Sequence, residues 1–245
     1  MSDSHDLSPD STAGEIAHQS NVHLRTSKTR LSQVWSNPLG LSVLLVVSVS
    51  LKYGISLHPN WFRFLDAANQ WPDASNSLLA VGDRALLSNV ATSWLAGALG
   101  ATTEHSFIVF SAALTALALI LPLLLAPAEV ARPFSQLYML VAAGGSLAHV
   151  LLMWVGGYDA LLACALVVGA LSRNNWIAAS GWFVASFSHT SVALPALVLW
   201  ATFKLLDKPR EINRTPIQSI ILPSVALALG GLAIKLTTNV WGGST

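Results

Sequence analysis

Long apolar runs, separated by short segments that hold most of the charged residues, constrain the fold of this chain more than any other feature. Only 10% of the residues are charged and 53% are hydrophobic, whereas a soluble domain carries roughly a quarter charged residues. A helix needs about 20 apolar residues to cross the hydrocarbon core of a membrane. The sequence therefore predicts an all-α, polytopic membrane helix bundle. Its net charge of +1 offers no basic surface for nucleic acid.

The amino-terminal segment 1–36 differs from the rest because it is polar and poor in apolar residues. Such a composition predicts a disordered tail, followed by a single transmembrane domain over 37–245. Arg25, Lys28 and Arg30 lie just before the first apolar run, and positive flanks of this kind are held on the cytoplasmic side. We therefore expect a cytoplasmic amino terminus. Cys164 is the single cysteine, so no disulfide can form within one copy of the chain.

The apolar stretches predict about seven membrane helices. Five of these stretches stand alone, at 38–57, 106–126, 134–155, 160–171 and 217–235. The stretch 176–202 lies between Arg173 and Lys204, which belong on the same, cytoplasmic side, so this stretch must cross an even number of times. We expect it to form a hairpin of two short helices that turns at the polar residues 188–191. The carboxyl terminus then lies outside.

The long segment 58–105 between the first two clear spans predicts a large outer loop with interfacial helices. Its residues 89–101 are apolar, but no basic residue follows them to hold their end inside. Trp61, Trp71 and Trp94 suit the headgroup level, where an indole ring is buried and its N–H stays hydrated. We therefore interpret this segment as lying at the outer surface of the membrane.

Polar residues from distant parts of the sequence converge on that outer face. The predicted topology places there Asp66, Asp73, Asp83, Tyr158, Asp159, His189 and Thr190. Carboxylates, an imidazole and a phenol around the ends of short helices are what a polar site at the membrane surface needs. Simpler roles stay open. Asp159 can cap the following helix. The His189 imidazole can form its hydrogen bonds with neighbouring residues of its turn, and His149 can hydrogen-bond to a neighbouring helix.

Several motifs of soluble enzymes are missing from the sequence. It contains no G-x-S-x-G elbow, no H-E-x-x-H zinc helix, no Walker loop and no Rossmann glycine fingerprint. We therefore expect no cofactor, no metal and no soluble nucleotide.

The layout resembles the GT-C glycosyltransferases, which use polyprenyl-phosphate-linked sugars. The likeness consists of a first span followed by a large outer loop with acids, a turn of the form G-x-Y-D in GGYDALL, and a hairpin of short helices. The stretch SRNNWIAASGWFVASFSHTSVALPALVLW is also similar to a hairpin of bacterial polysaccharide polymerases, with a basic residue at its start and a histidine at its turn.

The resemblance implies a transferase of the plasma (inner) membrane that moves a sugar from a lipid-phosphate carrier to a hydroxyl acceptor at the outer face. It implies that Asp66, or next Asp73, is the general base. Arg63 and Arg84 are then candidates for binding the carrier phosphate, since a guanidinium matches a phosphate well. Tyr158, Asp159 and His189 would line the substrate cavity.

A non-enzymatic alternative stays open. A membrane subunit or small transporter with an outer polar cavity has the same short helices and interfacial tryptophans. Neutralising Asp66 or His189 distinguishes the two, because an enzyme loses turnover while a scaffold tolerates both changes.

Overall fold

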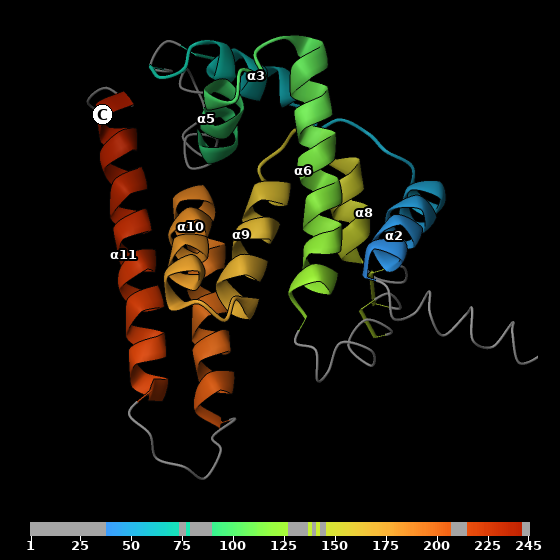
Figure 1. Ribbon diagram of the computed structural model, residues 1–245. Helices are drawn as coiled ribbons and strands as arrows, with labels where there is room; N and C mark the ends of the chain where they lie inside the picture. The colour runs from blue at the N-terminus through green and yellow to red at the C-terminus, as the bar shows by residue number, and fades with distance from the viewer. Residues whose placement is uncertain are drawn as a thin grey trace, which may run out of the picture. The chain divides into compact units, whose positions relative to one another are not determined.

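The computed structural model describes residues 38–73, 77–78, 90–126, 137–138, 141–142, 146–206 and 215–241. These residues form helices and no strand. The helices are α2 (Pro38–Tyr53), α3 (Trp61–Asn69), α5 (Val90–Ala98), α6 (Glu104–Leu125), α8 (Ser146–Met153), α9 (Asp159–Leu171), α10 (Asn175–Leu206) and α11 (Thr215–Trp241), as Figure 1 shows. The chain divides into two units, Met1–Leu41 and Ser42–Thr245, and every contact described below lies within the second. The predicted tail 1–36 lies outside the described residues.

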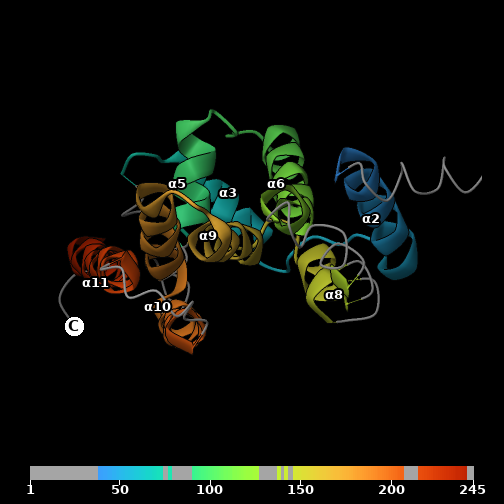
Figure 2. The same ribbon diagram turned by 60° about the horizontal axis from the view of Figure 1, so that its bottom comes forward.

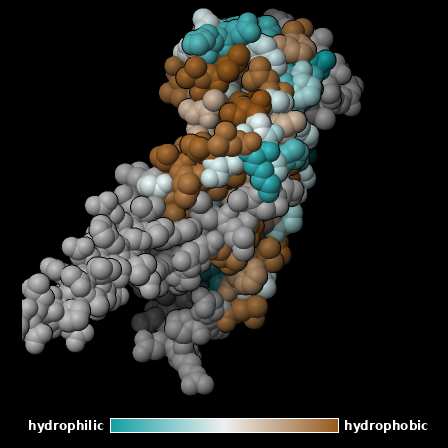
Figure 3. Space-filling model, turned by 90° about the vertical axis from the view of Figure 1, so that its right-hand side faces the viewer, coloured by the Kyte–Doolittle hydropathy of each residue, from teal (hydrophilic) through white to brown (hydrophobic). Residues whose placement is uncertain are grey.

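By length and composition three helices qualify as candidate membrane spans: Glu104–Leu125, Asn175–Leu206 and the part Ser219–Leu236 of α11. The second of these is broken at His189 into two shorter arms. The helices α2 and α9 are apolar but shorter. Large apolar side chains also point outward, including Val109, Leu117 and Leu124 on α6, and apolar side chains cover much of the described surface in Figure 3. An outward apolar surface of this extent indicates contact with lipid rather than water. The predicted all-α fold is thus confirmed for the described residues, and the three candidate spans indicate a membrane protein. The bundle of about seven membrane helices stays a prediction.

The second predicted span, 106–126, is present as α6. The helix begins where Thr103 accepts a hydrogen bond from the Ser106 amide at 3.2 Å, while the Ser106 side chain accepts one from the Thr103 amide at 3.0 Å. This reciprocal pair satisfies two amides that have no partner within the helix. The buried stripe of α6 faces α9, where the Cys164 thiol donates to the Leu114 carbonyl at 3.8 Å.

The first predicted span ends earlier than the sequence pattern indicates. The apolar run continues to Leu57, but α2 ends at Tyr53 because Gly54 adopts a φ of +76°, which stops a right-handed helix. The following residues are extended and pair with the end of α8: Ser56 donates to Leu152 at 2.9 Å and His58 to Val155 at 2.8 Å. The predicted span 134–155 likewise ends at Met153, and part of it lies outside the described residues.

The predicted hairpin is present in α10. His189 breaks the helix with a φ of −159° and a ψ of 86°. The rings of Trp182 and Trp200 lie 5.6 Å apart, although the same residues in a straight helix would be about 27 Å apart. The arms 175–188 and 190–206 therefore run back along each other, as Figures 1 and 2 show. Each is about 21 to 25 Å long, which is shorter than the hydrocarbon core of about 30 Å.

Small residues let the hairpin pack closely against its neighbours. A Cβ on Gly181 would lie 2.5 Å from the Gly169 amide nitrogen, so these two glycines allow α9 and α10 to touch through their backbones. The Trp182 ring covers Gly169, and the Trp200 indole donates to the Ala170 carbonyl at 3.1 Å. Gly230 of α11 contacts the Phe183 carbonyl in the same manner. Close approach through small residues is the usual way in which membrane helices associate.

The segment 58–105 contains two short helices in its described part, as predicted. Amphipathic α3 and apolar α5 share a core with the start of α6, formed by Phe64, Ala67, Ala68, Val90, Ala96, Ala101 and Phe107. The side chain of Tyr158 packs against this core. Trp94 of α5 lies 5.7 Å from Phe187, ring to ring, so α5 also reaches the end of the first hairpin arm.

Candidate functional site

The two glycines of the GGYD turn allow the chain to enter α9 beneath α3. Gly156 has a φ of +90°, which side-chain-bearing residues rarely adopt, and a Cβ there would also lie 3.2 Å from the Trp61 Cβ. A Cβ on Gly157 would lie 3.0 Å from the His58 ring. The turn is therefore held between α3 and the segment before it, and it places Tyr158 and Asp159 at the start of α9.

His58 supports this turn, and sequence reasoning missed it. Its Nδ1 accepts a hydrogen bond from the Asn60 amide at 3.0 Å, and its ring meets those of Phe64 and Trp154 edge-on at 5.6 and 5.5 Å. Burial lowers the pKa of His58, so the imidazole is neutral with its proton on Nε2. The only signal in the sequence is its position between an apolar run and Pro59.

Tyr158, Asp159 and His189 come together where the start of α9 meets the tip of the α10 hairpin. The rings of Tyr158 and His189 lie 5.4 Å apart. The His189 imidazole is near enough to the Asp159 carboxylate for a favourable charge interaction. Its Nδ1 also lies 2.8 Å from the Ser191 hydroxyl, which fixes the ring. Burial, and secondarily the charge of Asp159, raise the pKa of Tyr158, so the phenol stays protonated at neutral pH.

Asp159 is the first residue of α9, and the N-cap position belongs to Tyr158, which makes no side-chain capping bond. The Asp159 Oδ2 atom is buried and has no hydrogen-bond partner among the described residues. A buried carboxylate oxygen normally has a partner, because leaving it unsatisfied is costly. Capping alone therefore does not account for Asp159, and this oxygen is available to another group.

Five buried hydroxyl groups in the neighbouring elements also lack a partner within the described part of the chain. They belong to Thr92 and Ser93 on α5, Ser111 and Thr115 on α6, and Ser188 next to His189. Ser111 lies beneath the GGYD turn, 3.9 Å from where a Cβ on Gly156 would be. Sequence reasoning missed these hydroxyls, because serine and threonine are common within membrane helices.

The loop residues predicted for catalysis and phosphate binding have other surroundings. Asp66 accepts hydrogen bonds from the Leu78 amide at 2.6 Å and from Gln70 Nε2 at 3.2 Å, so its carboxylate fastens the chain that follows α3. Asp73 is exposed. The Arg63 guanidinium lies over the Phe62 ring, 5.9 Å from its centre. Asp83 and Arg84 lie outside the described residues.

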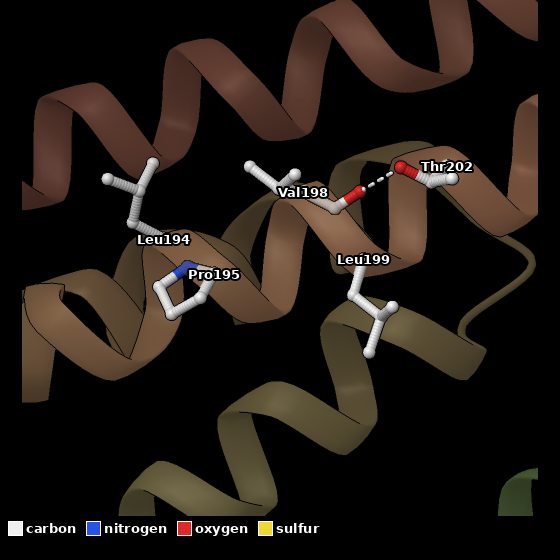
Figure 4. A pocket seen from close by; sticks show the side chains of 5 residues that line it. All are labelled: Leu194, Pro195, Val198, Leu199 and Thr202. Atoms are coloured by element: carbon white, nitrogen blue, oxygen red, sulfur yellow. Dashed lines mark hydrogen bonds between the residues drawn. The ribbon is translucent and has the colours of Figure 1, made fainter.

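An apolar groove of about 480 Å³ runs along the second hairpin arm, lined by Leu194, Pro195, Val198, Leu199 and Thr202. Figure 4 shows that the one polar group among them, the Thr202 hydroxyl, donates to the Val198 carbonyl at 2.8 Å. The groove therefore offers no group for chemistry and suits a hydrocarbon chain.

No protein family, no curated protein and no solved structure matches this chain. The function is therefore argued from the geometry of the site alone.

Proposed function

We propose that this protein is a membrane glycosyltransferase that acts at the outer face of the plasma (inner) membrane on a lipid-phosphate-linked sugar. The observation that carries the proposal is the Asp159 carboxylate, which has an unpartnered buried oxygen beside His189 and Tyr158. Burying an ionisable group in a membrane protein costs free energy, and such groups generally mark a functional site.

The site suits removal of a proton from a hydroxyl group. The Asp159 carboxylate takes the proton of the acceptor hydroxyl, the hydroxyl oxygen forms a bond to the sugar C1, and the bond from C1 to the phosphate oxygen breaks. The phosphate leaves with its electron pair and needs no proton. The Tyr158 phenol, whose ring lies 5.4 Å from that of His189, can donate to the reacting groups. Asp159 is a better base than Asp66, whose carboxylate is already bound to the Leu78 amide.

The topology that belongs to this proposal has about seven membrane helices, with the amino terminus in the cytoplasm and the carboxyl terminus outside. Arg173 and Lys204 support it, because they lie at the ends of the hairpin arms that are remote from His189. The short arms and short α9 leave room for a polar site above their ends. The apolar groove beyond Ser191 provides a surface for the hydrocarbon chain of the carrier.

The test uses the full chain reconstituted in lipid vesicles with radiolabelled polyprenyl-phosphate hexose and a membrane extract as the source of acceptor. We expect D159N to lower transfer about 100-fold or more, the usual worth of a general base. D66N should lower it only a few-fold, through disturbance of the loop at Leu78.

Loss of transfer in D66N with full activity in D159N would transfer the role of base to Asp66. If the wild-type chain transfers no sugar, or if both variants keep full activity, the protein is not this enzyme. A membrane subunit or small transporter is then the better interpretation.

A further inference from the structure

Five hydroxyls differ from the other helical hydroxyls in the described part of the chain: those of Thr92, Ser93, Ser111, Thr115 and Ser188. Serine and threonine within helices commonly donate to the carbonyl four residues earlier. Thr190, Thr202 and Ser224 do so here, at 2.7, 2.8 and 2.9 Å. The five residues named above are instead at most 2% exposed, and their hydroxyls have no partner within the described residues.

Ser111 and Thr115 lie on the face of α6 that packs on α9, and Ser111 is near the level of Asp159. The start of α6 meets the start of α9, since Phe107 lies 3.5 Å from where a Cβ on Gly156 would be. Further along, Cys164 contacts Leu114, so the two helices run in the same direction. Counting back from that contact at about 1.5 Å per residue places Ser111 within about 3 Å of the height of Asp159.

Ser188 approaches the same region from the other side. It is 0% exposed and directly precedes His189, whose ring lies against Tyr158. The start of α9, which carries the unpartnered Asp159 oxygen, is thus flanked by α6 with Ser111 and by the hairpin tip with Ser188. Buried polar groups are almost always satisfied by protein or by a bound molecule.

We propose that Ser111, Ser188 and Asp159 form a buried subsite that binds an uncharged, hydroxyl-rich group, namely the sugar ring of the substrate. This inference rests on the proposed function and specifies the class of sugar. Each hydroxyl both donates and accepts, as the hydroxyls of a neutral hexose do. The Asp159 carboxylate disfavours a ring that carries its own carboxylate. Ordered water, which has the same hydrogen-bonding chemistry, occupies the subsite when no sugar is bound.

The experiment measures how fast single cysteines react with a small hydrophilic methanethiosulfonate reagent in vesicles. The variants are S111C and S188C in a C164A background. S224C is the matched control, because the Ser224 hydroxyl is already bonded to Ile220. Both subsite cysteines should react, whereas S224C and native Cys164 should not. Polyprenyl-phosphate hexose at about ten times its Kd should slow labelling about ten-fold, since only unoccupied protein reacts. Polyprenyl phosphate alone and polyprenyl-phosphate uronic acid should protect much less.

If polyprenyl-phosphate hexose does not slow the labelling, the subsite holds only water, and the sugar subsite would be overturned. No labelling of either variant would mean a dry interior and would overturn it as well. Equal protection by the uronic acid or by the bare carrier would refute the stated class of ligand. Each of these results can occur while wild-type transfer remains intact, so failure of the subsite is distinguishable from failure of the proposed function.

Discussion

Two histidines, His58 and His189, have contrasting roles at the scale of single residues. His58 is buried and uses its Nδ1 as a hydrogen-bond acceptor beneath the GGYD turn. His189 lies at the tip of the hairpin, where Ser191 orients its ring and Asp159 attracts its charge. His58 therefore acts through its shape and its Nδ1 acceptor in the neutral form, while His189 contributes a ring that lies against Tyr158.

The lowered pKa of His58 gives a stability that depends on pH. Because the folded protein binds this proton more weakly than the unfolded chain, the stabilising effect is complete above about pH 6.5 and is lost as the pH falls below it. We expect the melting temperature of the wild type in detergent, followed by tryptophan fluorescence, to fall between pH 7 and pH 5. H58N supplies an acceptor that does not titrate, so its melting temperature should fall less. Parallel pH curves for the two proteins would contradict the role given to His58.

At the scale of helices, the backbone contact between Gly169 and Gly181 fixes α9 against the hairpin. A methyl group on Gly181 would meet the backbone of α9 at 2.5 Å, and backbone cannot move aside as a flexible side chain can. G181A should therefore destabilise the protein by about 1 to 3 kcal/mol, the usual range for overpacking. S180A, at the adjacent exposed position, should change stability little. Chemical denaturation in mixed micelles measures both, and equal stability of the two variants would refute the close contact.

The sequence allowed the helices to be predicted better than their ends. The hairpin could be predicted because Arg173 and Lys204 require an even number of crossings, and its turn follows from the polar residues around His189. The early end of α2 could not, because an apolar run does not reveal that Gly54 adopts a positive φ.

The candidate site was predictable only in part, for a similar reason. Topology placed Tyr158, Asp159 and His189 on one face, and the structure brings them together. Two features depend on contacts between residues distant in sequence. They are the hydrogen bond from the Leu78 amide to Asp66 and the lack of a hydrogen-bond partner for the Ser111 and Ser188 hydroxyls. Such contacts leave no periodic signal.

At the scale of the whole molecule, short helices and the polar site are linked. α9 and both arms of α10 are each shorter than the hydrocarbon thickness of a membrane, and the start of α9 meets the hairpin tip at the polar site. Broken helices at membrane depth are tolerated where protein or a cavity satisfies their ends. The helices α3 and α5 supply that cover. Tyr158 packs against the core that they share with α6, and Trp94 of α5 packs against Phe187.

The most direct test of this account is cross-linking of Y158C with H189C in a C164A background by a short bifunctional thiol reagent. We predict rapid intramolecular cross-linking, because the two native rings lie 5.4 Å apart. W182C with W200C should also cross-link, which tests the hairpin separately, whereas Y158C with K204C, at opposite ends of the helices, should not. Cross-linking of the tryptophan pair without the Tyr158 and His189 pair would mean that the hairpin forms but does not meet α9, and the proposed site would be wrong.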